Sequence, residues 1–234
     1  MNRLMLGIVM LVVSAGMISA GVAGANVTAG TPVTLGTGAS GSVGAWGGNI
    51  TVVNLTINST TLHWQAFYGN VSAGLRLASN QSGTTYTVKS WTVDNLRGVV
   101  FASRGNNIDF TNLSTADPAL NSLDTAFPFL SSANDRANNT GTDNANPTMT
   151  VGPYTITANT RPIIQTSNST STTAWTQVIL NDGDTSAATH YVFAVPINAS
   201  GVAYDNSAAN YQIIVPANAS IGTSTTYYFY GEIQ

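Results

Sequence analysis

Apolar and polar residues alternate with a period of two along most of the chain after Asn49. Val53, Leu55 and Ile57 alternate with asparagine and threonine, and residues 62–68 and 71–77 repeat the pattern. This period is typical of a strand with one buried face. Further strand candidates are 84–93, 98–103, 148–157, 174–180, 190–197, 210–216 and 224–233. With turn signals between them, they predict an all-β fold, an immunoglobulin-like or Greek-key β-sandwich over residues 49–234.

One polar insertion, residues 113–147, interrupts this pattern. Asp117 followed by Pro118 resembles a helix N-cap and first helical position, which predicts a short helix over 118–127. Residues 131–147 hold almost no apolar side chain and are expected to form an exposed loop. A division into two small β modules, 49–147 and 148–234, is the alternative to one domain.

A local repeat links two of the strand candidates. The pattern Tyr191-x-x-x-Val195-Pro196-x-Asn-Ala-Ser recurs 20 residues later from Tyr211. Each copy describes a strand that ends at a proline, because proline cannot serve a central ladder. The repeat predicts two neighbouring strands of one sheet that end at the same rim.

Residues 26–48 have the pattern of an N-terminal arm followed by a glycine-rich tether. One side of the arm strand would carry Val27, Ala29, Thr31, Val33 and Leu35. Six glycines fall within residues 36–48, a composition typical of a flexible linker. A short strand on a flexible tether suits pairing with another molecule. An edge strand that folds back on its own sheet is the alternative.

Residues 1–25 resemble a secretory signal peptide. Arg3 gives a positive start, Leu4 to Val13 is apolar, and Ala23-Gly24-Ala25 is a small-residue cleavage site. Cleavage would leave a mature chain that begins at Asn26 and lies outside the cell. The alternative is a retained anchor, since Leu4 to Ala25 is about long enough to cross a bilayer, and only then would the protein contact a membrane.

The composition narrows the classes of function. Only 7% of the residues are charged, with a net charge of -3, while 43% are hydrophobic, which excludes an ordinary disordered chain. So few Lys and Arg residues argue against nucleic acid as a partner. The 0 cysteines exclude disulfides and thiolate metal sites.

Asparagine sequons of the form Asn-x-Ser/Thr indicate a glycosylated surface. There are 11 of them among 24 asparagines, about twice the number expected from the Ser and Thr content. They are Asn26, Asn49, Asn54, Asn58, Asn70, Asn80, Asn112, Asn138, Asn168, Asn198 and Asn218.

Candidate catalytic chemistry is sparse. A Ser–His–Asp triad could use His190 with Asp182 or Asp184, but no nucleophile motif accompanies it. The segment 181–184 (NDGD) resembles part of a calcium loop without its later glutamate, and a hairpin turn explains it as well. We therefore expect no enzyme, no cofactor and no catalytic or metal-binding residues.

Aromatic residues are the densest candidate contact groups. Trp64, Tyr68, Tyr227 and Phe229 are expected in the core of the sandwich. Phe67, Tyr228 and Tyr230 would then lie on the opposite faces of their strands, where they could form a contact between subunits.

Four segments of the chain carry recognisable motifs: 47–51 (GGNIT), 64–72 (WQAFYGNVS), 100–104 (VFASR) and 225–230 (TTYYFY). In these segments the chain resembles a family of secreted archaeal surface glycoproteins. It implies an exported glycoprotein of β architecture. The composition and the arm are also similar to archaeal filament subunits that assemble by strand donation, whereas the leader and long N-terminal helix of type IV pilins are missing.

These features together predict a structural subunit of an archaeal surface filament. It would assemble with copies of itself when the arm of one subunit inserts into the next. A monomeric or anchored adhesin that binds carbohydrate is the alternative, and a component of a surface lattice is a third possibility.

Overall fold

The computed structural model describes residues 21–33, 42–57, 59–113, 116, 118–217 and 224–234. Its strands are β1 (Ala23–Gly24), β2 (Trp64–Gly69), β3 (Leu75–Gln81), β4 (Thr84–Trp91), β5 (Gly98–Ser103), β6 (Met149–Val151), β7 (Tyr154–Ile156), β8 (Ile163–Thr166), β9 (Trp175–Asn181), β10 (Tyr191–Pro196), β11 (Tyr211–Pro216) and β12 (Tyr228–Ile233). Its helices are α1 (Leu120–Ala126), α2 (Ala137–Thr140) and a single 3-10 turn, Ala188–His190.

A six-stranded antiparallel sheet forms the centre of the molecule, in the order β1-β12-β5-β10-β9-β8. Strands β5 and β10 lie in its middle and are buried on both faces. This explains why their sequences, GVVFAS and YVFAVP, are continuous apolar runs rather than alternating ones. Because β5 lies between β12 and β10, the sheet combines strands from both halves of the chain.

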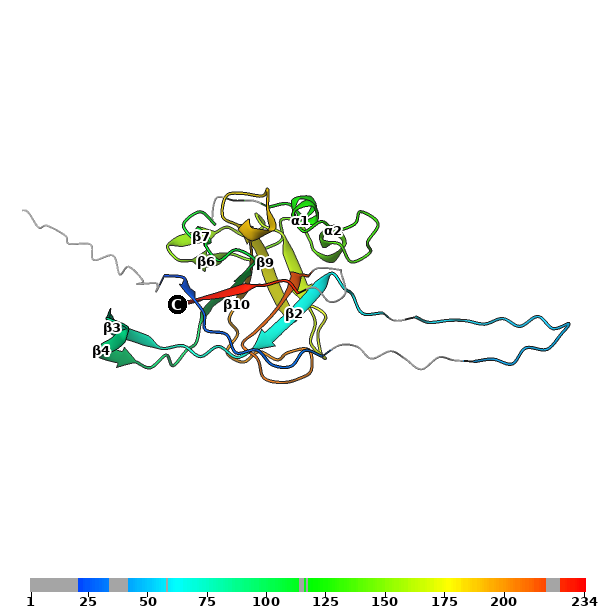
Figure 1. Cartoon of the computed structure of the whole chain (residues 1–234), viewed down its shortest axis with the longest axis horizontal. Coiled ribbons are helices and arrows are strands. Elements are labelled where there is room, and N and C mark those ends of the chain that lie inside the picture. The colour runs from blue at the N-terminus through cyan, green and yellow to red at the C-terminus, as the bar shows by residue number, and fades with distance from the viewer. Residues whose placement is uncertain (1–20, 34–41, 58, 114–115, 117, 218–223) are drawn as a thin grey trace, which may run out of the picture.

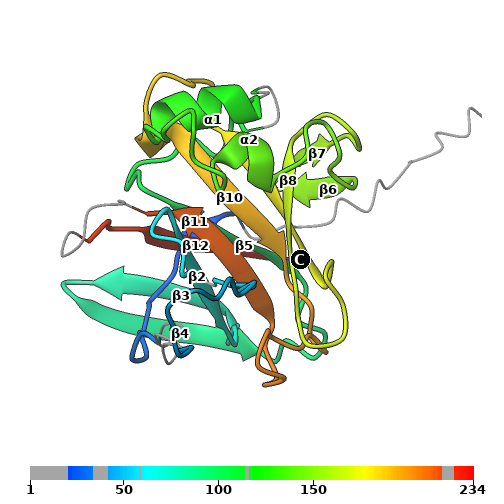
Figure 2. The same cartoon turned by 90° about the vertical axis from the view of Figure 1, so that its right-hand side faces the viewer.

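The two-stranded sheet β11-β2 and helix α1 cover one face of the central sheet (Figure 2). Ile213 of β11 and Leu123 of α1 are fully buried against Phe193 of β10 in one hydrophobic cluster. The hairpin β6-β7 covers the other face, where Val151 and Ile156 pack against Phe101. The chain is thus a layered, antiparallel all-β protein, which confirms the all-β, sandwich-like prediction. The immunoglobulin-like Greek-key connectivity is not confirmed.

Gly98 marks a close approach between β5 and β12. Its φ is +138°, and a Cβ at this position would lie 1.8 Å from the carbonyl oxygen of Glu232. Only glycine therefore allows β12 to pair with β5 to its end, at Ile233↔Gly98.

The strand predicted from the alternation of Val53, Leu55 and Ile57 with polar residues is not formed in the described residues. Residues 49–57 have no strand assignment and are exposed, with Ile50 100% and Leu55 78% accessible. Asn58 lies outside the described residues. A period of two shows which side chains share a face, but a strand also needs a partner, and the described residues of this chain supply none here.

Strands β3 and β4 form a hairpin that projects from the body (Figure 1). Every residue of both strands is exposed, including Leu77 and Val88. Ser82 and Gly83 both have positive φ, 51° and 82°, as a two-residue hairpin turn requires. The sequence predicted strands over 71–77 and 84–93, so β3 begins four residues later than expected, and the isolation of both strands from the core was not predicted.

The arrangement predicted from the sequence repeat, two neighbouring strands of one sheet, is wrong. Strand β10 belongs to the central sheet and β11 to the two-stranded sheet, so the copies are not neighbours in one sheet. They contact each other face to face, with Phe193, Val195, Ile213 and Val215 in one cluster. The repeated apolar positions therefore reflect a shared core and not a shared ladder.

The insertion is more ordered than predicted. Helix α1 begins at Leu120 after an N-cap at Ala119, later than the predicted start, and Asp117 lies outside the described residues. The predicted loop 131–147 contains α2, whose Ala137 is buried. The single strand predicted over 148–157 is a hairpin, turned at Gly152 with φ +54°, and β8 was missed because it is only 4 residues long.

Candidate functional site

The N-terminal arm is an exposed, extended segment without a strand partner among the described residues. Residues 26–33 carry no strand assignment, and Val27 and Val33 are 54% and 75% accessible. Ala29 and Thr31 are exposed as well, and Leu35 lies outside the described residues. In Figure 1 this dark-blue segment leaves β1 and runs along the outside of the body.

A second exposed segment, residues 42–57, extends far from the body (Figure 1). It exposes Trp46, Ile50, Val52 and Ile57 by 71% or more each. Scattered exposed apolar residues are ordinary, but several together on a projecting chain are typical of a surface that a partner covers.

The edge of the central sheet at β12 is covered over about half its length. Strand β1 contributes only the pairs Ala23↔Gly231 and Gly24↔Tyr230, and the Ala25 N–H donates to the Phe229 carbonyl at 2.9 Å. The other side of β12 pairs with β5 along its whole length. An edge of this kind presents backbone groups that another chain can pair with.

The opposite edge of the same sheet is closed differently. Thr142 and Ile163 of β8 exchange two backbone hydrogen bonds of 2.9 Å across that edge. Thr142 follows α2, so the insertion blocks this side. The β12 edge is thus covered in part by a short strand of the N-terminal segment, and the β8 edge in part by the insertion.

The aromatic residues divide differently from the prediction. Phe67 packs on Phe229, with ring centroids 5.3 Å apart, and so contacts the core instead of facing a partner. Tyr68, expected in the core, is 40% accessible because it lies on the outer side of β2. Trp64, by contrast, does pack against the core cluster, and its indole N–H donates to the Asp135 carbonyl at 2.6 Å.

Three tyrosines in and next to β12 also differ from one another in burial and contacts. Tyr230 packs against Phe110, and its hydroxyl donates to the Gly105 carbonyl at 2.9 Å, so it is part of the fold. Tyr227 donates to the Pro216 carbonyl at 2.7 Å, and burial raises its pKa. Only Tyr228, 41% accessible, keeps the exposure that a subunit contact needs.

His190 meets both predicted carboxylates. Its Nδ1 lies 2.8 Å from Asp182 and its Nε2 lies 3.6 Å from Asp184. With a carboxylate at each ring nitrogen, neither nitrogen is left to activate a serine hydroxyl, as a triad requires. Within the described residues, no group of three or more His, Asp or Glu side chains is placed to hold a metal ion.

His63 forms a second cluster of polar side chains, which no pattern in the sequence predicted. Its Nδ1 lies 2.9 Å from Asp135, and the Thr61 hydroxyl donates to the same carboxylate. A nucleophilic triad needs the hydroxyl on the histidine, whereas here both groups meet on the aspartate. The cluster therefore ties the start of β2 to the insertion.

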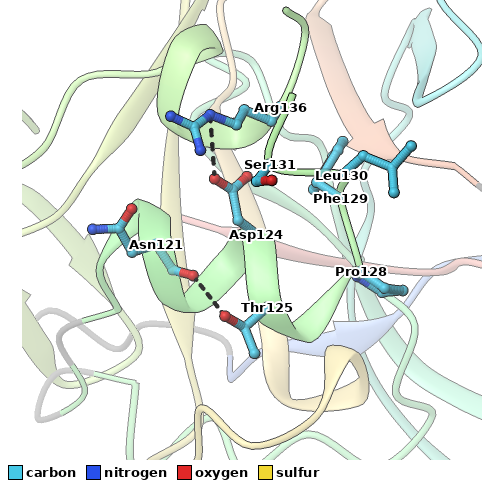
Figure 3. Close-up of a pocket in the computed structure, with 8 residues that line it drawn as sticks. All are labelled: Asn121, Asp124, Thr125, Pro128, Phe129, Leu130, Ser131 and Arg136. Atoms are coloured by element: carbon cyan, nitrogen blue, oxygen red, sulfur yellow. Dashed lines mark hydrogen bonds and ion pairs between the residues drawn. The ribbon is translucent and has the colours of Figure 1, made fainter. Parts of the chain in front are cut away.

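A surface hollow of about 510 Å³ lies beside α1 (Figure 3). Asp124 and Arg136 point toward each other across it, with 4.0 Å between Oδ2 and Nε. The other oxygen of Asp124 accepts the Ala137 N–H at 2.7 Å and so caps α2. The charged groups of this hollow hold α1 and α2 together.

The sequons differ in accessibility. Asn26, Asn49, Asn54, Asn70, Asn80 and Asn198 are exposed, whereas Asn58 and Asn218 lie outside the described residues. Asn138 and Asn168 are half-buried. The side-chain amide of the half-buried Asn112 donates to the Asp182 carbonyl at 3.0 Å, and that of Asn138 donates to the Asn121 side chain at 2.6 Å.

Comparisons with known proteins add no assignment. No protein-family model matches the chain, and neither curated proteins nor solved structures give a match. In the described part of the chain, no helix has both the length and the apolar character needed to span a membrane.

Proposed function

We propose that this protein is a glycosylated structural subunit of an extracellular filament on an archaeal cell. The arm residues Val27, Ala29, Thr31 and Val33 of one subunit would pair with a sheet edge of the next. The proposal includes export through the general secretory route and N-glycans on the exposed sequons.

The observation that carries the proposal is the arm itself. It is an extended segment with exposed valines, and it stands beside a folded body whose sheet has an edge, at β12, that a short strand covers only in part. Such a segment gains backbone hydrogen bonds and buries apolar side chains when it joins a sheet. Donation from each subunit to the next is a head-to-tail contact, which builds an open fibre.

The test uses the native protein recovered from its source cells. Deleting residues 26–36 should abolish filaments in electron micrographs and leave a monomer or an aggregate, because the donor is lost. The paired change Val27→Asp and Val33→Asp should do the same without shortening the chain, since a charge on the donor face cannot be buried unpaired.

Gly30→Asp is the matched control, because residue 30 lies on the opposite side of an extended arm and belongs to no sequon. It should leave filaments intact. Normal filaments from the deletion variant would overturn strand donation, and dispersed particles from the wild type would overturn the filament role itself.

The alternative, a carbohydrate-binding adhesin, has one observation in its favour. Tyr68 and Tyr204 form an exposed edge-to-face pair with ring centroids 5.3 Å apart, and the Tyr68 hydroxyl donates to Asp205 at 3.1 Å. Exposed rings beside a carboxylate suit stacking and hydrogen bonding to a sugar. Glycan-array binding by dispersed wild-type protein, lost in Tyr204→Ala, would favour this function.

A further inference from the structure

The strand at the β12 edge comes from the segment that processing is expected to remove. Ala23, Gly24 and Ala25 are the predicted cleavage site, and the same residues pair with β12. Val22, just before them, packs partly against the core cluster around Phe101. Cleavage after Ala25 would therefore remove a piece of the folded sheet.

The direction of this pairing matters for the arm that follows. In the antiparallel ladder, Ala23 faces Gly231, Gly24 faces Tyr230, and Ala25 bonds to Phe229. Each further residue moves toward the start of β12, which begins at Tyr228. The arm therefore passes the first residue of β12 almost at once. While β1 is in place, residues 27–33 have no β12 residue opposite them to pair with.

We propose that Val22–Ala25 is a placeholder strand that occupies the acceptor edge at β12 until the leader is removed. The β12 edge then receives residues 27–33 of a second copy of this chain. This inference rests on the proposed filament function, and it adds both the acceptor site and the event that opens it.

The placeholder is suited to being replaced. Its residues 21–25 (GVAGA) are mostly glycine and alanine, which are poor strand formers, and it covers only a part of β12. The arm offers Val27, Thr28, Thr31 and Val33, whose β-branched side chains favour strands. Pro32 is compatible with an edge strand, where one side of the backbone stays unpaired.

The test measures binding of a fluorescent peptide with the sequence of residues 26–34 to the full chain. Every variant carries Val27→Asp and Val33→Asp, so that its own arm cannot donate. The processed form should bind the peptide. A form that also carries Ala25→Leu keeps its leader, because the cleavage site needs a small residue, and should bind at least about tenfold more weakly, since a strand already occupies the edge.

Ala25→Pro is the matched variant for membrane attachment. It also blocks processing, but it removes the N–H that donates to Phe229. Purified in the same detergent, this form should bind the peptide about fivefold more tightly than the Ala25→Leu form, the effect of one lost hydrogen bond. Hydrogen exchange of the Phe229 and Gly231 amides, which lie on the β1 side of β12, should be slow in the Ala25→Leu form, fast in the processed form, and slow again with peptide.

Equal peptide binding by the processed and Ala25→Leu forms would overturn the placeholder, as would equal binding by the Leu and Pro forms. A peptide with both valines replaced by aspartate should not bind to any form, and binding by it would overturn β12 as the acceptor. The filament function fails separately, if wild-type cells carry no filaments of this chain. The placeholder proposal alone fails if such filaments form and depend on the arm, but the forms with and without the leader bind the peptide equally.

Discussion

At the residue scale, one carboxylate joins distant parts of the chain. Asp135, in the insertion, accepts hydrogen bonds from the Thr61 hydroxyl and from the ring of His63, and its carbonyl accepts the Trp64 indole N–H. Burial raises the pKa of Asp135, but the hydrogen bonds from Thr61 and His63 outweigh this and hold it below 3.8. The folded protein therefore favours the ionised form.

This shift predicts a pH-dependent contribution to stability. Asp135→Asn should lower the free energy of unfolding by about 1 kcal/mol at pH 7, since charge-assisted bonds are lost while the group stays partly solvated. Because the pKa of the folded state is lowered, the contribution is full above the ordinary value of 3.8 and disappears as the pH falls through the folded-state pKa.

Urea unfolding of the wild type and the Asp135→Asn variant at pH 7 and at successively lower pH values measures the difference. Asp94→Asn, at an exposed position, is the control and should change little at any pH. A difference that stays constant from pH 7 to pH 2 would contradict the assignment.

The sequence predicted the environment of some aromatic side chains correctly and of others wrongly. Tyr227 and Phe229 pack against the core as expected, while Tyr68 and Phe67 exchanged the places predicted for them. Strict alternation assigned Phe67 to the outer face. It reaches the core because Phe229, from a distant strand, offers a ring to pack against, and no local pattern contains that contact.

At the element scale, a buried glutamine connects the two sheets. The side-chain amide of Gln177, on β9, donates to the Ile214 carbonyl and accepts the Ile214 N–H, both at 2.8 Å. On the side of β11 that faces away from β2, this side chain forms the backbone hydrogen bonds that a neighbouring strand would otherwise form. The two-stranded sheet is thereby held over the central sheet by polar as well as apolar contacts.

Gln177→Leu should therefore lower the free energy of unfolding by about 2 kcal/mol, because both backbone groups of Ile214 lose their partner. Gln165→Leu, at an exposed position on β8, should change it by about 0.5 kcal/mol or less. Thermal or urea unfolding of both variants measures the contrast, and equal effects would mean that the Gln177 amide contributes nothing specific.

The elements best predicted from the sequence are those bounded by clear signals. Strand β5 has the predicted bounds, 98–103, because it begins at a glycine and both its faces are apolar. The strand prediction within residues 49–57 is wrong because alternation carries no information about a partner strand. The sheet order could not be predicted, since β5 and β10 pair across a separation that no local pattern encodes.

At the scale of the whole molecule, the folded body carries three exposed extensions: the arm, residues 42–57 and the β3-β4 hairpin (Figure 1). An isolated two-stranded hairpin is marginally stable in water. In a filament, neighbouring subunits would cover these extensions.

Trypsin measures this difference directly, because the chain has only 7 Lys and Arg residues. In dispersed subunits, cleavage should occur first at Arg76 and Lys89 in the exposed hairpin, while the half-buried Arg136, which is followed by the buried Ala137, should be cut later. Filaments should be cut at Arg76 and Lys89 at least about tenfold more slowly, since a protected site is cut only from a rare open state. Equal rates would mean that the hairpin takes no part in assembly.

The order of the arm and β12 along the chain has a consequence for how a filament of the proposed kind would begin and stop. The arm precedes β12, and the proposed acceptor edge exists only after residues 228–233 have paired with β5. A chain that breaks off before β12 could still donate but could never receive. Incorporated at a growing end, it would act as a terminator, so that a small fraction of incomplete chains would shorten every filament in the cell.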